Sequence, residues 1–203
     1  MERKLPASFY QRDDVLAIAG ELLGKLLVTN FNGRVTSGRI VETEAYNGII
    51  DKASHASGGR RTQRNEVMYG NGGVSYVYLC YGIHHLFNVV TSTKNTPHAV
   101  LIRALEPVKG VDIMLKRTGR KQFVPLITRG PGNLSRAMGI LVKHSGVKLA
   151  GPEIIIADDG FRYDKDQIAV SPRIGVDYAG EDAALPYRFF IKGSPFVSGK
   201  PNK

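Results

Sequence analysis

Residues 74–91 read Val-Ser-Tyr-Val-Tyr-Leu-Cys-Tyr-Gly-Ile-His-His-Leu-Phe-Asn-Val-Val-Thr. The β-prone residues on both sides of a Tyr-Gly step predict two antiparallel strands joined by a tight turn. Gly82 can adopt the positive φ that such a turn requires. Tyr76 and Tyr78 share one face of a regular strand, whereas Tyr81 falls at the tip, where its side chain cannot easily reach its own core. Tyr81 is therefore either an incidental surface residue or a wedge for a partner.

The chain before this hairpin predicts a helix and then a second hairpin. Asp13 and Asp14 precede apolar residues at helical spacing, and acidic residues suit the first turn of a helix. Residues 25–30 and 35–46 read as strands on either side of Asn32-Gly33, a dipeptide typical of hairpin turns.

The chain after the tyrosine hairpin predicts shorter elements. Apolar runs indicate strands over residues 99–103, 154–157, 168–170 and 188–192. We expect one helix to open at Glu106-Pro107 and another at Gly130-Pro131-Gly132, because a helix tolerates proline in its first turn. Strands that arrive as hairpins rather than as βαβ units favour the α+β class. We expect a single domain over residues 1–203, with a curved, mostly antiparallel sheet, surrounding helices and a protruding β-hairpin.

Composition narrows the cellular setting. No stretch approaches the ~20 apolar residues of a membrane helix, and the first residues do not resemble a secretory signal, so no membrane partner is expected. The single cysteine, Cys80, excludes an intramolecular disulfide and a multi-cysteine zinc site, and we expect it to be a buried, inert thiol. A reducing compartment follows, which we take to be the cytoplasm, in association with the nucleoid.

The charge balance favours a polyanionic partner. The formal net charge is +10, with 28 Lys and Arg against 18 Asp and Glu, as is typical of proteins that bind nucleic acids. The basic residues cluster in two segments that read as loops or helix ends, where side chains can reach phosphates: Arg60, Arg61 and Arg64, and Lys116, Arg117, Arg120 and Lys121. A basic soluble protein without such a partner is the alternative.

The strand over residues 38–46 carries an unusual pair of carboxylates. Glu42, Glu44 and Tyr46 fall on one face by alternation, together with Ile40. One interpretation is a solvent-facing sheet edge. Another is a carboxylate in a cleft that acts as general base for water. A third is an acid/base pair for sugar hydrolysis or a metal clamp, because i and i+2 residues lie roughly 6.5–7 Å apart.

Arg103 and three histidines are further candidates for a chemical role. Arg103 ends an apolar strand, so if buried it needs an anion, for which Glu44 is a candidate. His84 and His85 are adjacent on a strand and point to opposite faces, which is poor geometry for metal ligands, and His55 stands alone in a loop. No metal-binding motif is present, so neither a metal nor another cofactor is expected.

Several blocks of the sequence resemble one family across nearly the whole chain. They include Arg-Ile-Val-Glu-Thr-Glu-Ala-Tyr (39–46), Ala-Ser-His (53–55), Gly-Gly-Arg (58–60), Thr-Gln-Arg-Asn (62–65), Tyr-Val-Tyr-Leu-Cys-Tyr-Gly (76–82), Leu-Ile-Arg-Ala-Leu-Glu-Pro (101–107), Pro-Arg-Ile-Gly-Val (172–176) and Arg-Phe-Phe-Ile-Lys-Gly-Ser-Pro-Phe-Val-Ser (188–198). Together they resemble the alkyladenine, or 3-methyladenine, DNA glycosylases of the monofunctional, metal-free type.

The resemblance implies a hydrolase of N-glycosyl bonds that flips alkylated or deaminated purines from double-stranded DNA and initiates base excision repair. The purines implied are 3-methyladenine, 7-methylguanine, hypoxanthine and ethenoadenine. We expect a monomer without lyase activity. The resemblance implies that Glu44 is the general base and that Arg103 and the Val176 carbonyl hold the water. It implies that Tyr46 and Tyr78 enclose the base, and that His55 and Asn88 complete its pocket. Tyr81 is the implied wedge with Ile83 beside it, and the implied contacts to the DNA backbone are Arg60, Thr62, Arg64 and Met68.

Two other functions remain open from the residues alone. A non-catalytic damage-binding or RNA-binding module could use the same hairpin, although Glu44 would then have no task. A metal-assisted hydrolase or glycosidase could use Glu42 and Glu44 together. One departure from the family pattern lies beside the wedge, where His84 follows Ile83 in place of a second apolar or aromatic residue.

Overall fold

The computed structural model describes residues 2–199; the predicted domain of residues 1–203 extends beyond them at both ends. Its strands form one sheet, ordered β1-β7-β2-β3-β6-β5-β4, with β9 pairing both β3 and β8, and every pairing is antiparallel. The bounds are β1 Arg3–Lys4, β2 Leu26–Phe31, β3 Arg34–Tyr46, β4 Ser75–Cys80, β5 His84–Thr91, β6 His98–Lys109, β7 Ile154–Asp158, β8 Ile168–Ser171 and β9 Arg188–Ile191. The α+β prediction is confirmed.

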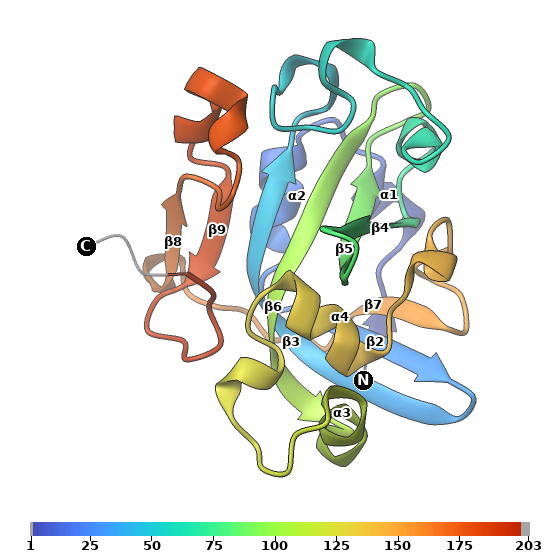
Figure 1. Ribbon diagram of the computed structural model, residues 1–203, viewed down its shortest axis with the longest axis vertical. Coiled ribbons are helices and arrows are strands. Elements are labelled where there is room, and N and C mark those ends of the chain that lie inside the picture. The colour runs from blue at the N-terminus through green and yellow to red at the C-terminus, as the bar shows by residue number, and fades with distance from the viewer. Residues whose placement is uncertain (1, 200–203) are drawn as a thin grey trace.

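Four α-helices surround this sheet in the described part of the chain: α1 Ala7–Tyr10, α2 Val15–Glu21, α3 Val111–Thr118 and α4 Pro131–Met138. Figure 1 shows α3 and α4 near the lower end of the long strands, with the β8–β9 pair at the left beside β3. Asp14 caps α2, because its side chain accepts from the Ala17 N–H at 2.9 Å. Pro131 occupies the first turn of α4, as predicted.

The core lies between α2 and the central strands. Ile18 of α2 and Leu22, which follows the helix, have no exposed surface, and they pack in one cluster with Ile40, Ile102 and Leu105 of β3 and β6. Burying each such side chain contributes roughly 1.5–3 kcal/mol. Since β3 pairs with β2 and β9 along one edge and with β6 along the other, its residues are held from both sides.

A β-bulge in β3 changes which residues face the core. The β3–β6 register shifts between Ile40 and Glu42 and again before Thr43. Ile40 and Val41 consequently both join the core cluster, so the expectation that Ile40 shares the face of Glu42 is wrong. A bulge adds a residue to one strand and breaks simple alternation.

The structure also corrects the predicted start of the helix at Glu106-Pro107. Strand β6 continues to Lys109, and helix α3 begins only after Gly110, whose φ is 75°. Pro107 is tolerated because β6 pairs with β5 only over residues 98–101, so its other edge is free of a strand there.

Candidate active site

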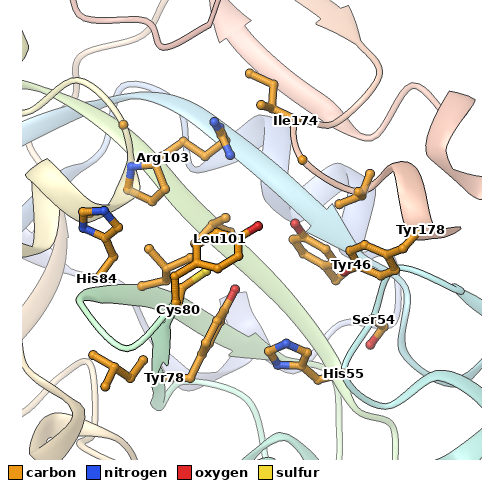
Figure 2. Close-up of a pocket in the computed structure, with 18 of the residues that line it drawn as sticks. Tyr46, Ser54, His55, Tyr78, Cys80, His84, Leu101, Arg103, Ile174 and Tyr178 are labelled. Carbon is orange, nitrogen blue, oxygen red and sulfur yellow. The ribbon is translucent and has the colours of Figure 1, made fainter.

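A cleft of about 840 Å³ opens between the tyrosine hairpin, the loop over residues 52–64, the N-terminus of α4 and the segment over residues 174–178. Figure 2 shows Tyr46, His55, Tyr78, Arg103 and Tyr178 around this space. At its inner end lies a narrower cavity of about 30 Å³, bounded by Met68, Tyr76, Asn88 and Ala99 among others. The structure thus brings the residues expected to enclose a base to one place.

Glu44 lies directly behind the wall of this cleft and has no exposed surface. Its Oε1 accepts the Ile174 N–H at 2.8 Å and lies 3.2 Å from Nη1 of Arg103. Its Oε2 accepts the Tyr46 hydroxyl at 3.0 Å. A carboxylate has about four acceptor positions, so these contacts leave one of them, on Oε2, for a further donor.

Glu42 differs from Glu44 in its partners. Its Oε1 accepts Nε–H of Arg103 at 2.9 Å, Nε–H of Arg188 at 2.8 Å and the Ser198 hydroxyl at 2.9 Å. Its Oε2 accepts the Ser198 N–H at 2.7 Å. Three of these donors share Oε1, and one reaches Oε2. The solvent-facing edge is excluded for both glutamates. Arg188 and Ser198 do not line the cleft, whereas the three partners of Glu44 all line it.

Arg103 bridges the two carboxylates and is itself nearly buried. Burial by itself lowers the pKa of the Arg103 guanidinium, but the charges of Glu44 and Glu42 outweigh it and raise that pKa. The ion pair predicted between Arg103 and Glu44 is present. Buried charges of this kind persist only when their partners satisfy them, and the structure supplies these partners from β3, β6 and β9.

Tyrosine side chains form the aromatic walls. Burial, and then the charge of Glu44, raise the pKa of Tyr46, so its phenol stays protonated and donates to that carboxylate. Tyr76 and Tyr78 lie with ring centroids 5.5 Å apart, and Tyr76 is only 2% exposed. Tyr76 is therefore a packing residue behind Tyr78.

His55 is held by a partner that the sequence did not reveal. Its Nδ1 lies 2.7 Å from the Tyr76 hydroxyl, and its ring meets that of Tyr78 edge-on at 4.5 Å. Burial, assisted by the charges of Arg64 and Arg60, lowers the pKa of His55 to about 4. The imidazole is neutral at pH 7. Because burial raises the pKa of Tyr76 to about 12, its phenol keeps its proton there as well.

Asn88 closes the inner cavity. It is 4% exposed, and its amide nitrogen donates to the carbonyls of Tyr76 at 3.1 Å and Leu86 at 3.3 Å. These bonds fix the plane of the amide group, which leaves its carbonyl oxygen as the group that faces a ligand at this end.

A buried ion pair supports the back of the Tyr46 ring. Arg173 donates to both carboxylate oxygens of Asp51, at 2.5 and 2.8 Å, and to the Ala45 carbonyl at 3.0 Å. Its guanidinium carbon lies 4.8 Å from the Tyr46 centroid. Asp51 also accepts the N–H groups of Asn47 and Ala53. Sequence reasoning did not single out this pair; the only signal was the position of Arg173 within the 172–176 block.

The expected DNA-contacting residues occupy different environments. Arg60, Thr62 and Arg64 are exposed, and the two arginines line the cleft. Asn65 holds this loop, because its side chain bonds to Thr62, Arg60 and His55. Met68 as a whole residue is 2% exposed and packs in a buried cluster with Tyr69 and Tyr76, so its burial does not support the expected contact with a DNA backbone.

The hairpin tip is exposed, as predicted. Tyr81 is 89% exposed and Ile83 71% exposed. Tyr81 and Gly82 both have positive φ, 50° and 72°, as a type I′ turn requires. The prediction for Cys80 is wrong: its thiol is partly exposed and lines the cleft, because Cys80 ends β4 and neighbours the tip rather than the core.

His84 and His85 lie beside the hairpin tip and contact the surrounding scaffold. His84 lies against Gly132 of α4, and Nδ1 of His85 accepts the Val142 N–H at 3.2 Å, so the two side chains do face different elements. Over residues 2–199, no group of three or more His, Cys, Asp or Glu side chains is placed to hold a metal ion.

The aromatic walls can enclose a flat base, and the carboxylate behind them can activate water for attack on the bond between that base and its sugar. This combination is typical of DNA glycosylases. The model of the family described as "Methylpurine-DNA glycosylase (MPG)" matches residues 8–195. The chain belongs to the methylpurine-DNA glycosylase family. It is a hydrolase of N-glycosyl bonds that acts in the repair of alkylated purines in DNA.

Relatives from several bacteria extend this similarity over their whole length. A protein of Chlamydia felis described as "Putative 3-methyladenine DNA glycosylase" is 50% identical over 188 residues, 92% of this chain and 95% of its own length. Proteins with the same description from Bacillus cereus strain G9842 and Desulfitobacterium hafniense are 47% and 44% identical, over 96% and 98% of this chain.

Proposed function

We propose that the protein excises 3-methyladenine and related damaged purines, namely 7-methylguanine, hypoxanthine and ethenoadenine, from duplex DNA, with Glu44 as general base. The observation that carries this proposal is the difference between the two buried carboxylates of β3. The three protein partners of Glu44 all line the aromatic cleft, and its Oε2 keeps an acceptor position beside Tyr46, whereas Glu42 is held by Arg188 and Ser198, which do not line the cleft.

The substrate must leave the base stack before its sugar bond can be attacked. Extrusion costs a few kcal/mol, and Tyr81, exposed at the hairpin tip, is placed to fill the gap that the purine leaves. The basic residues Arg60 and Arg64 beside the cleft are suited to the flanking phosphates. Ile83 adds apolar surface next to the wedge.

The flipped purine would lie between Tyr46 and Tyr78, with His55 and Asn88 at its edges. A neutral His55 suits this site, because a charged imidazole would repel an alkylated, cationic purine. A cation over an aromatic face gains about 0.5–2 kcal/mol, which favours the damaged base over its neutral counterpart.

Hydrolysis then needs a positioned water. Its oxygen bonds to C1′ of the sugar, its proton passes to Oε2 of Glu44, and the C1′–N bond breaks with its electron pair leaving on the purine. The Arg103 guanidinium, 3.2 Å from Oε1, supplies the counter-charge beside Glu44. The Val176 carbonyl already accepts the Ala179 N–H at 2.8 Å, so its second lone pair is the one that would hold the water.

The products are a free purine and an abasic site, and no lysine takes part in covalent chemistry. Lys52 is the lysine that lines the cleft among the described residues, and its carbonyl-reactive amine is not needed for direct attack by water. We therefore propose a monofunctional glycosylase without lyase activity. We further propose that it acts as a monomer associated with the nucleoid of the cytoplasm.

The test is the release of free base from duplexes that carry a single 3-methyladenine, hypoxanthine or ethenoadenine, with EDTA present. We expect release by the wild type and at least 10²-fold slower release by Glu44→Gln. Loss of wild-type activity in EDTA would indicate a metal-dependent reaction instead. An active Glu44→Gln variant would remove Glu44 from the role of base.

A further inference from the structure

Tyr178 stands where the outer cleft narrows into the inner cavity, and its side chain lines both. It comes from the segment that follows Val176, in the 3₁₀ helix Asp177–Ala184. In Figure 2 its ring lies beside that of Tyr46, on the side of the cleft opposite His84. The roles proposed for the other tyrosines of the cleft do not involve Tyr178.

Tyr178 is held far less firmly than the other aromatic residues of the cleft. The Tyr46 hydroxyl bonds to a buried carboxylate and its ring rests on Arg173. Tyr78 belongs to a paired strand and packs on Tyr76 and His55. Tyr178, by contrast, is 71% exposed. Within residues 2–199, the only hydrogen bond of its side chain is from its hydroxyl to the Ala53 carbonyl, at 3.0 Å.

That hydrogen bond joins two segments that form opposite sides of the mouth. One contains Ala53 and His55, and the other contains Val176 and Tyr178. The segments are also joined at their base, where Lys52 N–H donates to Asp182 at 2.7 Å. The two segments also pack through the buried cluster of Ala53, Val176 and Ala179, so they stay together without the Tyr178 hydroxyl, and the exposed Tyr178 ring can move separately from them.

A large aromatic face beside a base-binding cleft can stack on a nucleic-acid base. Contact between an aromatic ring and a base is typically worth tenfold or more in binding, because every base has a π-face. Tyr178 lines both the inner cavity and the outer cleft, so a purine that enters from the outer cleft passes next to its ring.

From this placement we infer that Tyr178 is a substrate-contacting residue: its ring closes on the flipped nucleotide at the mouth of the pocket after the hydroxyl releases the Ala53 carbonyl. The inference rests on the proposed function, because it requires a flipped purine. Closure would cover the nucleotide, and it would exclude from Glu44 all water except the attacking molecule, so its effect falls on steps after DNA binding.

The test compares Tyr178→Ala and Tyr178→Phe with the wild type in single-turnover release of ethenoadenine and hypoxanthine from duplex DNA at saturating enzyme. Tyr178→Ala should lower the rate constant about tenfold, because the ring is lost. Tyr178→Phe keeps the ring and loses only the hydrogen bond to Ala53, so its rate should stay within twofold of wild type or exceed it.

Two controls separate contact from a structural effect. Phe161→Ala removes a half-exposed aromatic ring that packs on Arg39, away from the cleft, and should leave the rate unchanged. The affinity of Tyr178→Ala for undamaged duplex and its thermal midpoint should equal those of the wild type. Ethenoadenine fluorescence in the bound duplex should be less quenched in Tyr178→Ala than in Tyr178→Phe.

The outcomes that overturn the inference differ from those that overturn the proposed function. If the wild type releases base and Tyr178→Ala does so at the same rate, Tyr178 does not contact the nucleotide. If Tyr178→Phe is as slow as Tyr178→Ala, the hydroxyl rather than the ring matters and the closure model is wrong. If the wild type releases no damaged purine, the proposed function fails first and this inference fails with it.

Discussion

Glu42 and Glu44 lie two residues apart on one strand and are equally buried, yet they occupy opposite kinds of environment. Glu42 is surrounded by Arg103, Arg188 and Ser198, of which only Arg103 lines the cleft. Glu44 shares Arg103 but otherwise meets one backbone N–H and one phenol at the cleft wall. The difference teaches that burial alone does not identify a reactive carboxylate. The position of its hydrogen-bond partners relative to the cleft does.

The largest effect is expected for Glu44→Gln, which tests whether Glu44 is the reactive carboxylate of the pair. The amide keeps the shape and cannot accept a proton, so we expect base release to fall by roughly 10²–10⁴-fold. The thermal midpoint should fall less than in Glu42→Gln, because Arg103 keeps Glu42 as a counter-charge and the amide oxygen can still accept the Ile174 N–H. Single-turnover kinetics and a thermal melt on the same preparation measure both. A large loss of stability with retained activity would invert the assignment.

Glu42→Gln should give the opposite result. It leaves Arg188 and part of Arg103 without a buried counter-charge, and removing one partner of a buried ion pair typically costs about 3–5 kcal/mol. Urea denaturation should show this loss in the free energy of unfolding. The fraction that remains folded should release base far faster than Glu44→Gln does. A stable but inactive Glu42→Gln would show that Glu42 takes part in the reaction.

The pH dependence of stability sharpens the comparison at the pocket beside Glu44. The pKa of His55 is about 4 in the folded protein and near 6.5 when unfolded, so the unfolded chain binds the proton first as pH falls. The free energy of unfolding therefore keeps its full value above about pH 6.5 and falls by up to about 3 kcal/mol between pH 6.5 and 4. Denaturation at several pH values measures this slope.

The control for that measurement is His55→Gln, which has no titrating group at this position and should lose most of the slope between pH 6.5 and 4. The carboxylates whose pKa values are depressed titrate lower: arginine hydrogen bonds chiefly hold the pKa of Asp159 near 2 and that of Asp158 lower still. An unchanged slope in His55→Gln would mean that other groups account for it.

The smallest expected effect concerns the hairpin, which depends on neither glutamate. Tyr81→Ala removes an 89% exposed ring, so stability should not change. Release from duplex DNA should fall by about tenfold, the typical worth of one stacked aromatic ring. Release from single-stranded DNA should be unaffected, because no gap needs filling. Equal losses on the two substrates would contradict the wedge role.

Local pattern was sufficient where local forces decide the structure. Asp14 capping α2, the Asn32-Gly33 turn and the Tyr81-Gly82 turn all follow from preferences of single residues for particular φ angles or hydrogen bonds. Local pattern failed at Pro107, because a free sheet edge tolerates proline, and at Cys80, because the hairpin extends away from the core.

The site shows the same division. The sequence by itself indicated one site for Glu44, Arg103, Tyr46 and Tyr78, because the motifs that carry them resemble one family and a buried arginine requires an anion. Only the tertiary structure decided that Arg188 and Ser198 bind Glu42, and that Tyr178 stands at the pocket mouth. These contacts join residues more than a hundred positions apart. Strand periodicity carries no information about such distant pairs, because they form only when the folded chain brings their segments together.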